Sequence, residues 1–349
     1  MNEPTNTNNG FDCVAWIIDN LAPKQVEAAE FIYDLMESQS GQCLPVVYQP
    51  FDARNDDHFA DRGWALDYVK SLGLGCRPAP AGRVLDFGPG DGWPSLIIAP
   101  FSDEVVGVDS SPKRVEVCKE NATRLGIENA QFTHVPAGKP LPFPDESFDA
   151  VAAASSIEST PDPQATLKEL FRVLRPGGKL RMFYEALNRY RDGREREAWI
   201  SGDGFEKAFI VIYDRRIDAE VVEQYRLSFD MSPAELRATL TQLGTSADYA
   251  GLNGPVLEEL KPQVAACAKC VTKHPSGRTW KQWLLDTGFS SVAGTHAGGP
   301  SARRLLSNLK DEDRPQDIVD VDQMLAPYIH VVVTMPAPLG TDPLLTAVK

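Results

Sequence analysis

The chain has 349 residues and a formal net charge of −14, with 42% hydrophobic and 24% charged residues. This length suffices for one large domain or two domains, and the composition is that of a globular protein. An acidic chain without a dense Lys/Arg segment argues against nucleic acid or an anionic membrane as a partner, because both require positive charge facing phosphate.

The first ten residues, MNEPTNTNNG, are polar and lack the basic and apolar regions of a signal peptide. No apolar run approaches the ~20 residues that a bilayer span requires. The cysteines at positions 13, 43, 76, 118, 267 and 270 are scattered, which does not suggest a disulfide framework. We therefore expect a soluble, cytoplasmic protein.

The N-terminal part reads as helical. Apolar residues at helical spacing predict helices over residues 23–37 and 58–72, and GCRPAPAG at 75–82 reads as a linker. We expect residues 1–80 to form a helical cap or lid. Its apolar stripe is a candidate surface for a homodimer.

From Arg83 the pattern alternates between strand and helix, which is typical of a doubly wound parallel sheet. The predicted strands are 83–87, 104–109, 129–135, 148–155 and 179–186, and the predicted helices are 93–100, 111–127 and 162–178. The rhythm then breaks. An antiparallel pair (208–231), a capped helix (232–244), a helix followed by a strand (279–296) and a last strand (328–335) are predicted.

These elements predict an α/β fold with a doubly wound, mostly parallel seven-stranded sheet and helices on both faces. Residues 81–189 and 276–349 would form this core. Residues 190–275 would be an α+β insertion after the fifth strand, and we expect it to contribute the substrate pocket.

The stretch VLDFGPGDGWP, residues 84–94, places a glycine turn after the first strand of the core. Ligands of open parallel sheets lie at the carboxyl ends of the strands, so the turn is in a binding position. A nicotinamide fingerprint would read G-x-G-x-x-G, whereas this turn reads G-x-G-x-G and follows Asp86. A carboxylate repels a pyrophosphate but suits an ammonium group or a cationic sulfur.

The next strand ends in Asp109, within EVVGVDSS. A carboxylate there can accept both hydroxyls of a ribose. Nicotinamide enzymes use the same device, so this residue alone does not discriminate between cofactors.

Together, VLDFGPGDG, VVGVDSS, LPFPDESFDAV and LKELFRVLRPGGKL resemble the class I S-adenosylmethionine-dependent methyltransferases in order and approximate spacing, over residues 83 to 185. The resemblance implies S-adenosylmethionine as cofactor, S-adenosylhomocysteine as product, and methyl transfer by in-line displacement to an O, N or S atom of a small-molecule acceptor. The residues implied in cofactor binding are Asp86, Gly88, Gly90, Gly92, Asp109, Ser110, Ala137, Ser155 and Ser156.

One departure concerns the adenine. Many relatives carry an acid before L-P-F that reads the adenine amino group, but VPAGKPLPF places Ala137 at that position. A backbone group or another residue must take over this contact.

Candidates for a general base are Tyr184 and Glu185 at the end of the fifth strand, and His58 in the N-terminal segment. Each has a structural alternative, as a strand-end, ion-pair or capping residue; His134, within the third strand, is taken as structural. Aromatic residues of the insertion could enclose a substrate or form the insertion's own core: Tyr190, Trp199, Phe205, Phe209, Tyr213 and Tyr225.

Cys267, Cys270 and His274 offer three zinc ligands, but no second CxxC supplies a fourth, and cysteines three apart can simply share a helix face. We predict no metal site. Two other functions stay open for the chain as a whole: an enzyme that uses the same cofactor without moving a methyl group, and a binding protein without catalysis.

Overall fold

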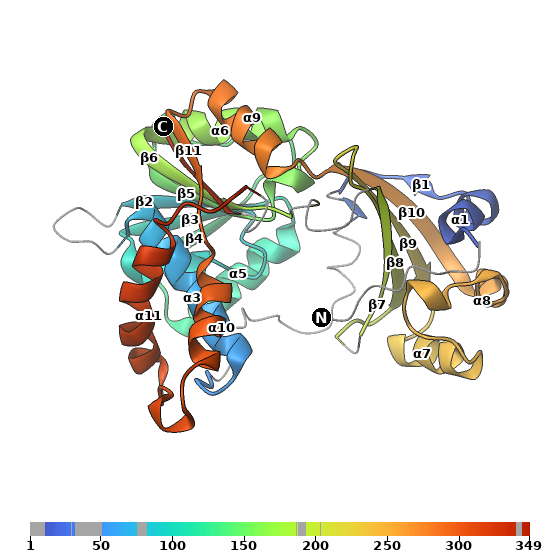
Figure 1. Ribbon diagram of the computed structural model, residues 1–349. Coiled ribbons are helices and arrows are strands. Elements are labelled where there is room, and N and C mark those ends of the chain that lie inside the picture. Colours follow the sequence, from blue (N-terminus) through green and yellow to red (C-terminus); the bar gives the residue numbers. More distant parts are fainter. Residues whose placement is uncertain are drawn as a thin grey trace. The chain divides into compact units, whose positions relative to one another are not determined.

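The computed structural model describes residues 11–28, 30–31, 51–74, 82–185, 187, 193–202, 204–339 and 344–349. Two compact units divide the chain (Figure 1). We call residues 42–186 and 275–349 the core unit, and residues 1–41 and 187–274 the accessory unit. The segment expected as one N-terminal cap, 1–80, is therefore divided between the two units.

The core unit contains the predicted mostly parallel sheet of seven strands, in the order β11-β12-β6-β5-β2-β3-β4. β12 runs antiparallel to both of its neighbours, β6 and β11, and the remaining neighbours in the sheet pair in parallel. The strands are β2 (Arg83–Phe87), β3 (Glu104–Asp109), β4 (Ala130–His134), β5 (Phe148–Ala154), β6 (Leu174–Phe183), β11 (Ser291–Gly294) and β12 (Leu344–Val348). Because β2 lies between β5 and β3, the strand order reverses at the carboxyl end of β2.

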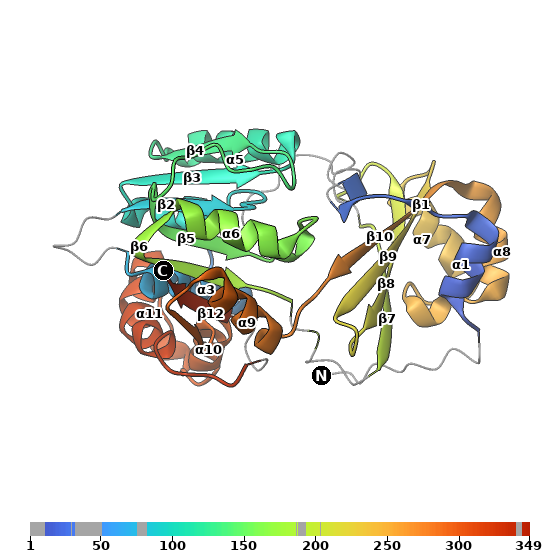
Figure 2. The same cartoon turned by 90° about the horizontal axis from the view of Figure 1, so that it is seen from above.

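Helices cover both faces of this sheet, as Figure 2 shows from above. One face is covered by α6 (Pro163–Val173) and α9 (Gly277–Thr287), and the other by α3 (Asp56–Leu72), α4 (Ser95–Ile98) and α5 (Pro112–Leu125). Successive residues of one strand point to opposite faces of the sheet. Leu85 packs on the face with α6 and α9, and Val84 packs on the face with α3 and α4. Both faces are thus buried, as a parallel sheet requires.

Two further helices, α10 (Gly298–Ser307) and α11 (Ile318–Val332), pack against α3. The strand predicted for 328–335 is wrong, because most of this segment is the end of α11. Its β-branched run favours a strand by propensity, but Ile329 and Val333 bury their side chains with Phe59 of α3. Tertiary packing therefore overrides local preference. The last strand is β12.

The accessory unit is built on a second sheet, in the order β1-β10-β9-β8-β7. The strands are β1 (Lys24–Gln25), β7 (Arg194–Ile200), β8 (Ala208–Arg216), β9 (Val221–Phe229) and β10 (Val264–Lys273). Fully described helices of this unit include α1 (Cys13–Leu21), α7 (Pro233–Gln242) and α8 (Gly254–Leu260). The predicted antiparallel pair is β8 and β9, and the predicted capping box begins α7. The three helices cover one face, where Ile17, Leu236 and Leu257 meet Ile210 and Leu227.

The helix predicted for 23–37 is wrong at its start. Lys24 and Gln25 form β1, which pairs in parallel with Ala268 and Lys269 of β10. An edge strand of a sheet offers unpaired backbone groups, and the chain uses them here. Residues 29 and 32–37 of this prediction lie outside the described residues. Within the described part of the chain, no helix has the length and apolar character of a bilayer span.

Candidate functional site

The glycine turn lies at the carboxyl end of β2, at the point where strand order reverses. Gly88, Gly90 and Gly92 all have positive φ angles, of 76°, 59° and 107°. A Cβ on Gly88 would lie 2.5 Å from Cβ of Ser156, whereas one on Gly90 would meet nothing within 4 Å. The turn therefore requires glycine by conformation at all three positions, and also by space at Gly88 and at Gly92, where a Cβ would lie 2.5 Å from Cδ1 of the buried Leu96. At Gly90 the backbone faces open space, as a ligand-binding loop requires.

Asp109, the last residue of β3, is tied to this turn. Its Oδ2 accepts the backbone N–H of Gly90 at 3.2 Å, and its Oδ1 accepts that of Ser111 at 2.8 Å. Burial raises the pKa of this carboxyl, and the backbone N–H bonds act in the opposite direction. Each carboxylate oxygen keeps lone pairs for further donors. The side chain can thus bind two hydroxyl groups while it holds the loop.

A second support comes from α5 and was missed by the sequence analysis. Arg114 forms an ion pair with Asp91, Cys118 donates to the Gly90 carbonyl at 3.2 Å, and Asn121 donates to the Asp91 carbonyl at 2.8 Å. These three residues follow one another at four and three positions, so they share one face of the helix. This spacing is the sequence pattern that could have indicated a helix face in contact with the glycine turn.

Asp86 is fully buried at the end of β2. Its Oδ2 accepts the Ser95 backbone N–H at 2.8 Å and the Ser95 hydroxyl at 2.5 Å, which holds the start of α4. Its Oδ1 has no hydrogen-bond partner among the described residues. Burial, with the nearby Asp109 charge, raises the pKa of Asp86 to about 7. The carboxyl thus orients the loop, and its contact with an amino group remains a prediction.

Ser155 and Ser156 follow β5 beside the turn. The Ser156 hydroxyl donates to the Phe87 carbonyl at 2.5 Å, which ties the ends of β5 and β2 together. Ser155 is exposed and has a left-handed φ of 50°. Such backbone is uncommon for serine and is often found at functional sites.

The expected adenine side lies at the ends of β3 and β4. Ser110 follows Asp109, and its carbonyl lies 3.2 Å from Nε2 of His134. His134 is exposed and pairs with Asp109 across the two strands. Ala137 is half-buried and follows β4. The structure therefore adds His134 to the residues around this end of the site.

The three candidates for a general base lie in different surroundings. Tyr184 is 1% exposed, lies in the apolar core beside Trp280, and burial raises its pKa to about 12. Glu185 is half-buried, and its backbone N–H donates to Oε1 of the buried Glu158 at 3.3 Å. His58 lies in the first turn of α3, where its Nδ1 accepts the Asp52 N–H at 3.0 Å.

Tyr68 of α3 is a further residue near the turn that the sequence did not indicate. Its ring meets that of Trp93 edge-on, with centroids 5.4 Å apart, and its hydroxyl is buried without a hydrogen-bond partner among the described residues. Burial is the main cause that raises its pKa well above the usual value, and the charge of Asp67, followed by those of Asp86 and Glu158, adds to it. His58 lies ten residues earlier on the same helix, about 15 Å along its axis.

The aromatic residues of the accessory unit do not form one group. Tyr225 is buried on the sheet face that the helices cover, whereas Trp199, Phe205 and Phe209 form a separate series of edge-to-face contacts. Tyr190 lies outside the described residues. This division favours a structural role for Tyr225, and the substrate pocket stays a prediction.

Cys267 and Cys270 lie on β10, so the alternative that they share a helix face is wrong. Three positions along a strand reverse the side-chain direction. Cys267 accordingly packs with the helices on one face, and Cys270 packs with Phe31 on the other. Within the described ranges, no group of three or more His, Cys, Asp or Glu residues has the geometry of a metal site.

Comparison with known proteins identifies the region around this site. Residues 85–182 match the methyltransferase domain family. A ubiquinone/menaquinone biosynthesis C-methyltransferase of Geotalea daltonii is 35% identical over 123 residues, which cover 34% of this chain and 51% of that protein. A 27-O-demethylrifamycin SV methyltransferase of Amycolatopsis mediterranei is 36% identical over 149 residues, 42% of this chain and 53% of that protein.

The chain spans about half the length of these curated relatives. Among solved structures, the CcbJ methyltransferase of Streptomyces caelestis aligns over 88% of this chain and 98% of its own, with 14% identity and a TM-score of 0.46. The segment that matches the methyltransferase domain family contains the glycine turn, Asp109 and Ser155.

Proposed function

We propose that the chain is a class I, S-adenosylmethionine-dependent methyltransferase, which transfers a methyl group from this cofactor to a small-molecule acceptor. The match of residues 85–182 to the methyltransferase domain family supports this. The observation that supports this most is Asp109, whose carboxylate holds the Gly90 N–H at the end of the neighbouring strand. The same carboxylate would thus bind the ribose hydroxyls and hold the turn that would lie against the methionine part of the cofactor.

The residues present fit the cofactor. Asp109 would accept the ribose hydroxyls, and the backbone from Gly88 to Gly92 would approach the amino-acid part. Ser155 and Ser156 would border the reactive end, and Ser110 with Ala137 would flank the adenine. When bound, S-adenosylmethionine supplies a methyl group on a cationic sulfur, which is a good leaving group.

The protein's task is then alignment of the acceptor and exclusion of water, which can provide most of the rate acceleration. Among the three candidate bases, Glu185 suits proton removal best by its position after β6 and its partial exposure. Tyr184 has a buried hydroxyl with a high pKa, and Nδ1 of His58 already accepts a hydrogen bond. We therefore propose Glu185 as the group to test for acceptors that need a base.

The first test is thermal unfolding with S-adenosylmethionine, S-adenosylhomocysteine and NAD in parallel. A ligand at 100 times its dissociation constant stabilises a protein by about 2.7 kcal/mol, which raises the midpoint by a few degrees at this size. We expect a rise with the first two compounds only. Incubation with methyl-labelled cofactor and a panel of hydroxy, amino and thiol compounds then separates transfer from binding alone.

Asp109→Asn provides the matched variant and Asp103→Asn the control, since Asp103 precedes the opposite end of the same strand and is exposed. Asp109→Asn should weaken S-adenosylhomocysteine at least tenfold, because one acceptor oxygen and the charge are lost. Equal affinity of the two variants would remove Asp109 from the site. A midpoint that responds to NAD instead would contradict the proposed cofactor.

A further inference from the structure

The helix α3 continues past the carboxyl edge of the core sheet. Along β6, Lys179 reaches Ser71, Arg181 reaches Asp67, and the ring of Phe183 meets that of Trp64 with centroids 5.5 Å apart. Successive positions of the strand toward its carboxyl end therefore lie beside successively earlier turns of the helix. Residues 56–63, which precede Trp64, must project beyond the edge where the glycine turn lies.

Small residues bring α10 against this projecting part. A Cβ on Gly63 would lie 2.5 Å from Cβ of Ala302, and one on Gly298 would overlap the Gly63 carbonyl. The Trp64 indole lies so close to Gly299 that a Cβ there would overlap it. The two helices thus cross in backbone contact, and the indole is fixed over the first turn of α10.

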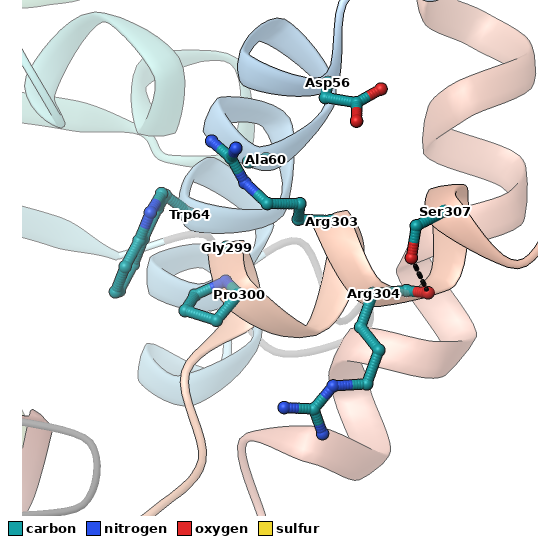
Figure 3. A pocket seen from close by; sticks show the side chains of 8 residues that line it. All are labelled: Asp56, Ala60, Trp64, Gly299, Pro300, Arg303, Arg304 and Ser307. Carbon is teal, nitrogen blue, oxygen red and sulfur yellow. Dashed lines mark hydrogen bonds between the residues drawn. The ribbon is translucent and has the colours of Figure 1, made fainter. Parts of the chain in front are cut away.

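A groove of about 530 Å³ opens along this crossing (Figure 3). Its volume is in the range of small-molecule sites. Trp64, Ala60 and Pro300 supply apolar surface, and Arg303 and Arg304 supply two positive charges in a chain of net charge −14. In Figure 3 the Arg303 side chain extends from α10 toward α3. The remaining lining residues are Asp56, Gly299 and Ser307.

Arg303 pairs with Asp57, but both side chains are more than half exposed, at 53% and 70%. Exposed ion pairs contribute little free energy, so a ligand anion can replace this partner at small cost. Arginine is also the side chain best suited to a planar carboxylate or a sulfonate beside an aromatic ring. In Figure 3 the Arg303 side chain lies on the side of the groove where Trp64 is, whereas the Arg304 side chain extends away from α3. An indole and the Arg303 guanidinium in one groove match an anion with an aromatic or apolar body.

We propose that this groove binds the non-reacting part of the methyl acceptor, and that the acceptor is a small amphipathic anion. Its aromatic or apolar body would lie on Trp64 and its acidic group at Arg303, with the Arg304 charge adding to the positive potential of the groove. This rests on the proposed function, because only methyl transfer makes a ligand at this edge an acceptor. Trp64, which lines the groove, contacts Phe183 at the carboxyl end of β6, the sheet edge where the turn lies. An acceptor in the groove can present its nucleophile to the cofactor site.

The test uses two probes that differ by one acidic group: 8-anilinonaphthalene-1-sulfonate and N-phenyl-1-naphthylamine, which lacks the sulfonate. Fluorescence titrations compare the full-length protein with the double variant Arg303→Gln/Arg304→Gln and with Trp64→Leu. The control is Arg278→Gln, an exposed arginine on α9 outside the groove. Thermal unfolding with S-adenosylhomocysteine is recorded for every variant.

We expect the sulfonate to bind the parent protein more tightly than the neutral probe. The double arginine variant should weaken the sulfonate about tenfold or more and leave the neutral probe unchanged, as expected for loss of charge-assisted contacts. Trp64→Leu should weaken both probes, and Arg278→Gln neither. Equal binding of the two probes, or a sulfonate affinity that does not depend on the two arginines, would overturn the proposal.

The acceptor assignment has its own readout. Labelled-methyl transfer to 3,4-dihydroxybenzoate and to its methyl ester should favour the acid, and the double arginine variant should remove that preference. A preference for the ester, or one that survives in the double variant, contradicts the assignment. Failure of the proposed function looks different: S-adenosylhomocysteine would not shift the midpoint of any variant, while the probe titrations would still report on the groove.

Discussion

The two faces of the core sheet are built from alternate residues of the same strands, yet they differ in kind. On the face covered by α6 and α9, Leu85 and Leu180 pack against apolar side chains such as Leu170 and Trp280. The next residue of each strand, Asp86 after Leu85 and Arg181 after Leu180, faces α3. Both side chains are at 0% exposure. One face is an apolar core, and the other contains buried charge.

The charges on the α3 face are held by an extended set of contacts. Arg181 donates to Asp67 at 2.9 Å, to Thr295 at 2.6 Å and to Thr346 at 2.9 Å, while Asp67 accepts the Gly298 backbone N–H at 2.7 Å. These contacts fix α3 and α10 on the sheet in one arrangement. Buried ion pairs contribute little net stability compared with apolar packing, so we infer that their role here is to fix geometry.

The largest expected effect is therefore that of breaking this pair. Asp67→Ala leaves the Arg181 guanidinium buried without its counter-charge and the Gly298 N–H without its acceptor. We expect a loss of about 3–5 kcal/mol in the free energy of unfolding, measured by urea denaturation. The double variant Asp67→Leu/Arg181→Met should recover much of this loss. A double variant as unstable as the single one would show that the charges themselves stabilise the fold.

The substitution on the apolar face to compare with Asp67→Ala is Leu170→Ala, in α6. It removes buried methyl groups from a fully buried position and should cost about 3 kcal/mol. We expect the folded variant to bind S-adenosylhomocysteine with unchanged affinity by calorimetry, whereas Asp67→Ala should weaken it through displaced α3. Equal losses of affinity in the two variants would show that the faces do not differ in function.

What the sequence could predict follows the same division. Apolar runs and their alternation predicted the core strands other than β12, and local motifs indicated the glycine turn and Asp109, because each of these signals is contained in a few consecutive residues. The apolar face of the sheet needs nothing more than such patterns.

The polar face could not be predicted in this way. Arg181 interrupts an apolar strand, and its partner Asp67 lies 114 positions away, so no local pattern connects them. The same holds for β1, whose two residues depend on β10, and for the end of α11, where packing on α3 decides against strand propensity. The groove also depends on contacts between helices that are distant in sequence. No local pattern indicates that Gly63, Gly298 and Gly299 allow these helices to approach each other.

Asp86 allows a smaller and pH-dependent test of the polar face. Its pKa is about 7 in the folded state and near 3.8 in the unfolded chain. Between these values the unfolded chain loses the proton while the folded protein keeps it, so stability should fall as pH rises from 4 to 7 and then level off. The side chain of Asp86→Asn does not titrate in this range. The free energy of unfolding of the variant minus that of the parent should therefore increase by about 1 kcal/mol per pH unit between pH 4 and 7.

The measurement for Asp86→Asn is the free energy of unfolding at pH 5, 6, 7 and 8. Ser95→Ala is the companion variant, since it removes the hydroxyl that donates to Asp86 but keeps the backbone donor. It should raise the pKa of Asp86 further and extend the slope to higher pH. A parent protein with the same pH profile as Asp86→Asn would mean that Asp86 is ionised throughout.

The smallest change in the free energy of unfolding is expected at the carboxyl edge of the sheet, at Ser155 after β5. Ser155→Gly relieves a left-handed φ of 50° and keeps the N–H bond to Phe183, but it also adds freedom to the unfolded chain. The two effects oppose each other, so the free energy of unfolding should change by less than about 1 kcal/mol. Ser156→Gly removes the hydroxyl bond to Phe87 with no strain to relieve and should cost more. If Ser155→Gly were the more damaging of the two, the exposed Ser155 side chain would have a structural role that its position at the edge does not indicate.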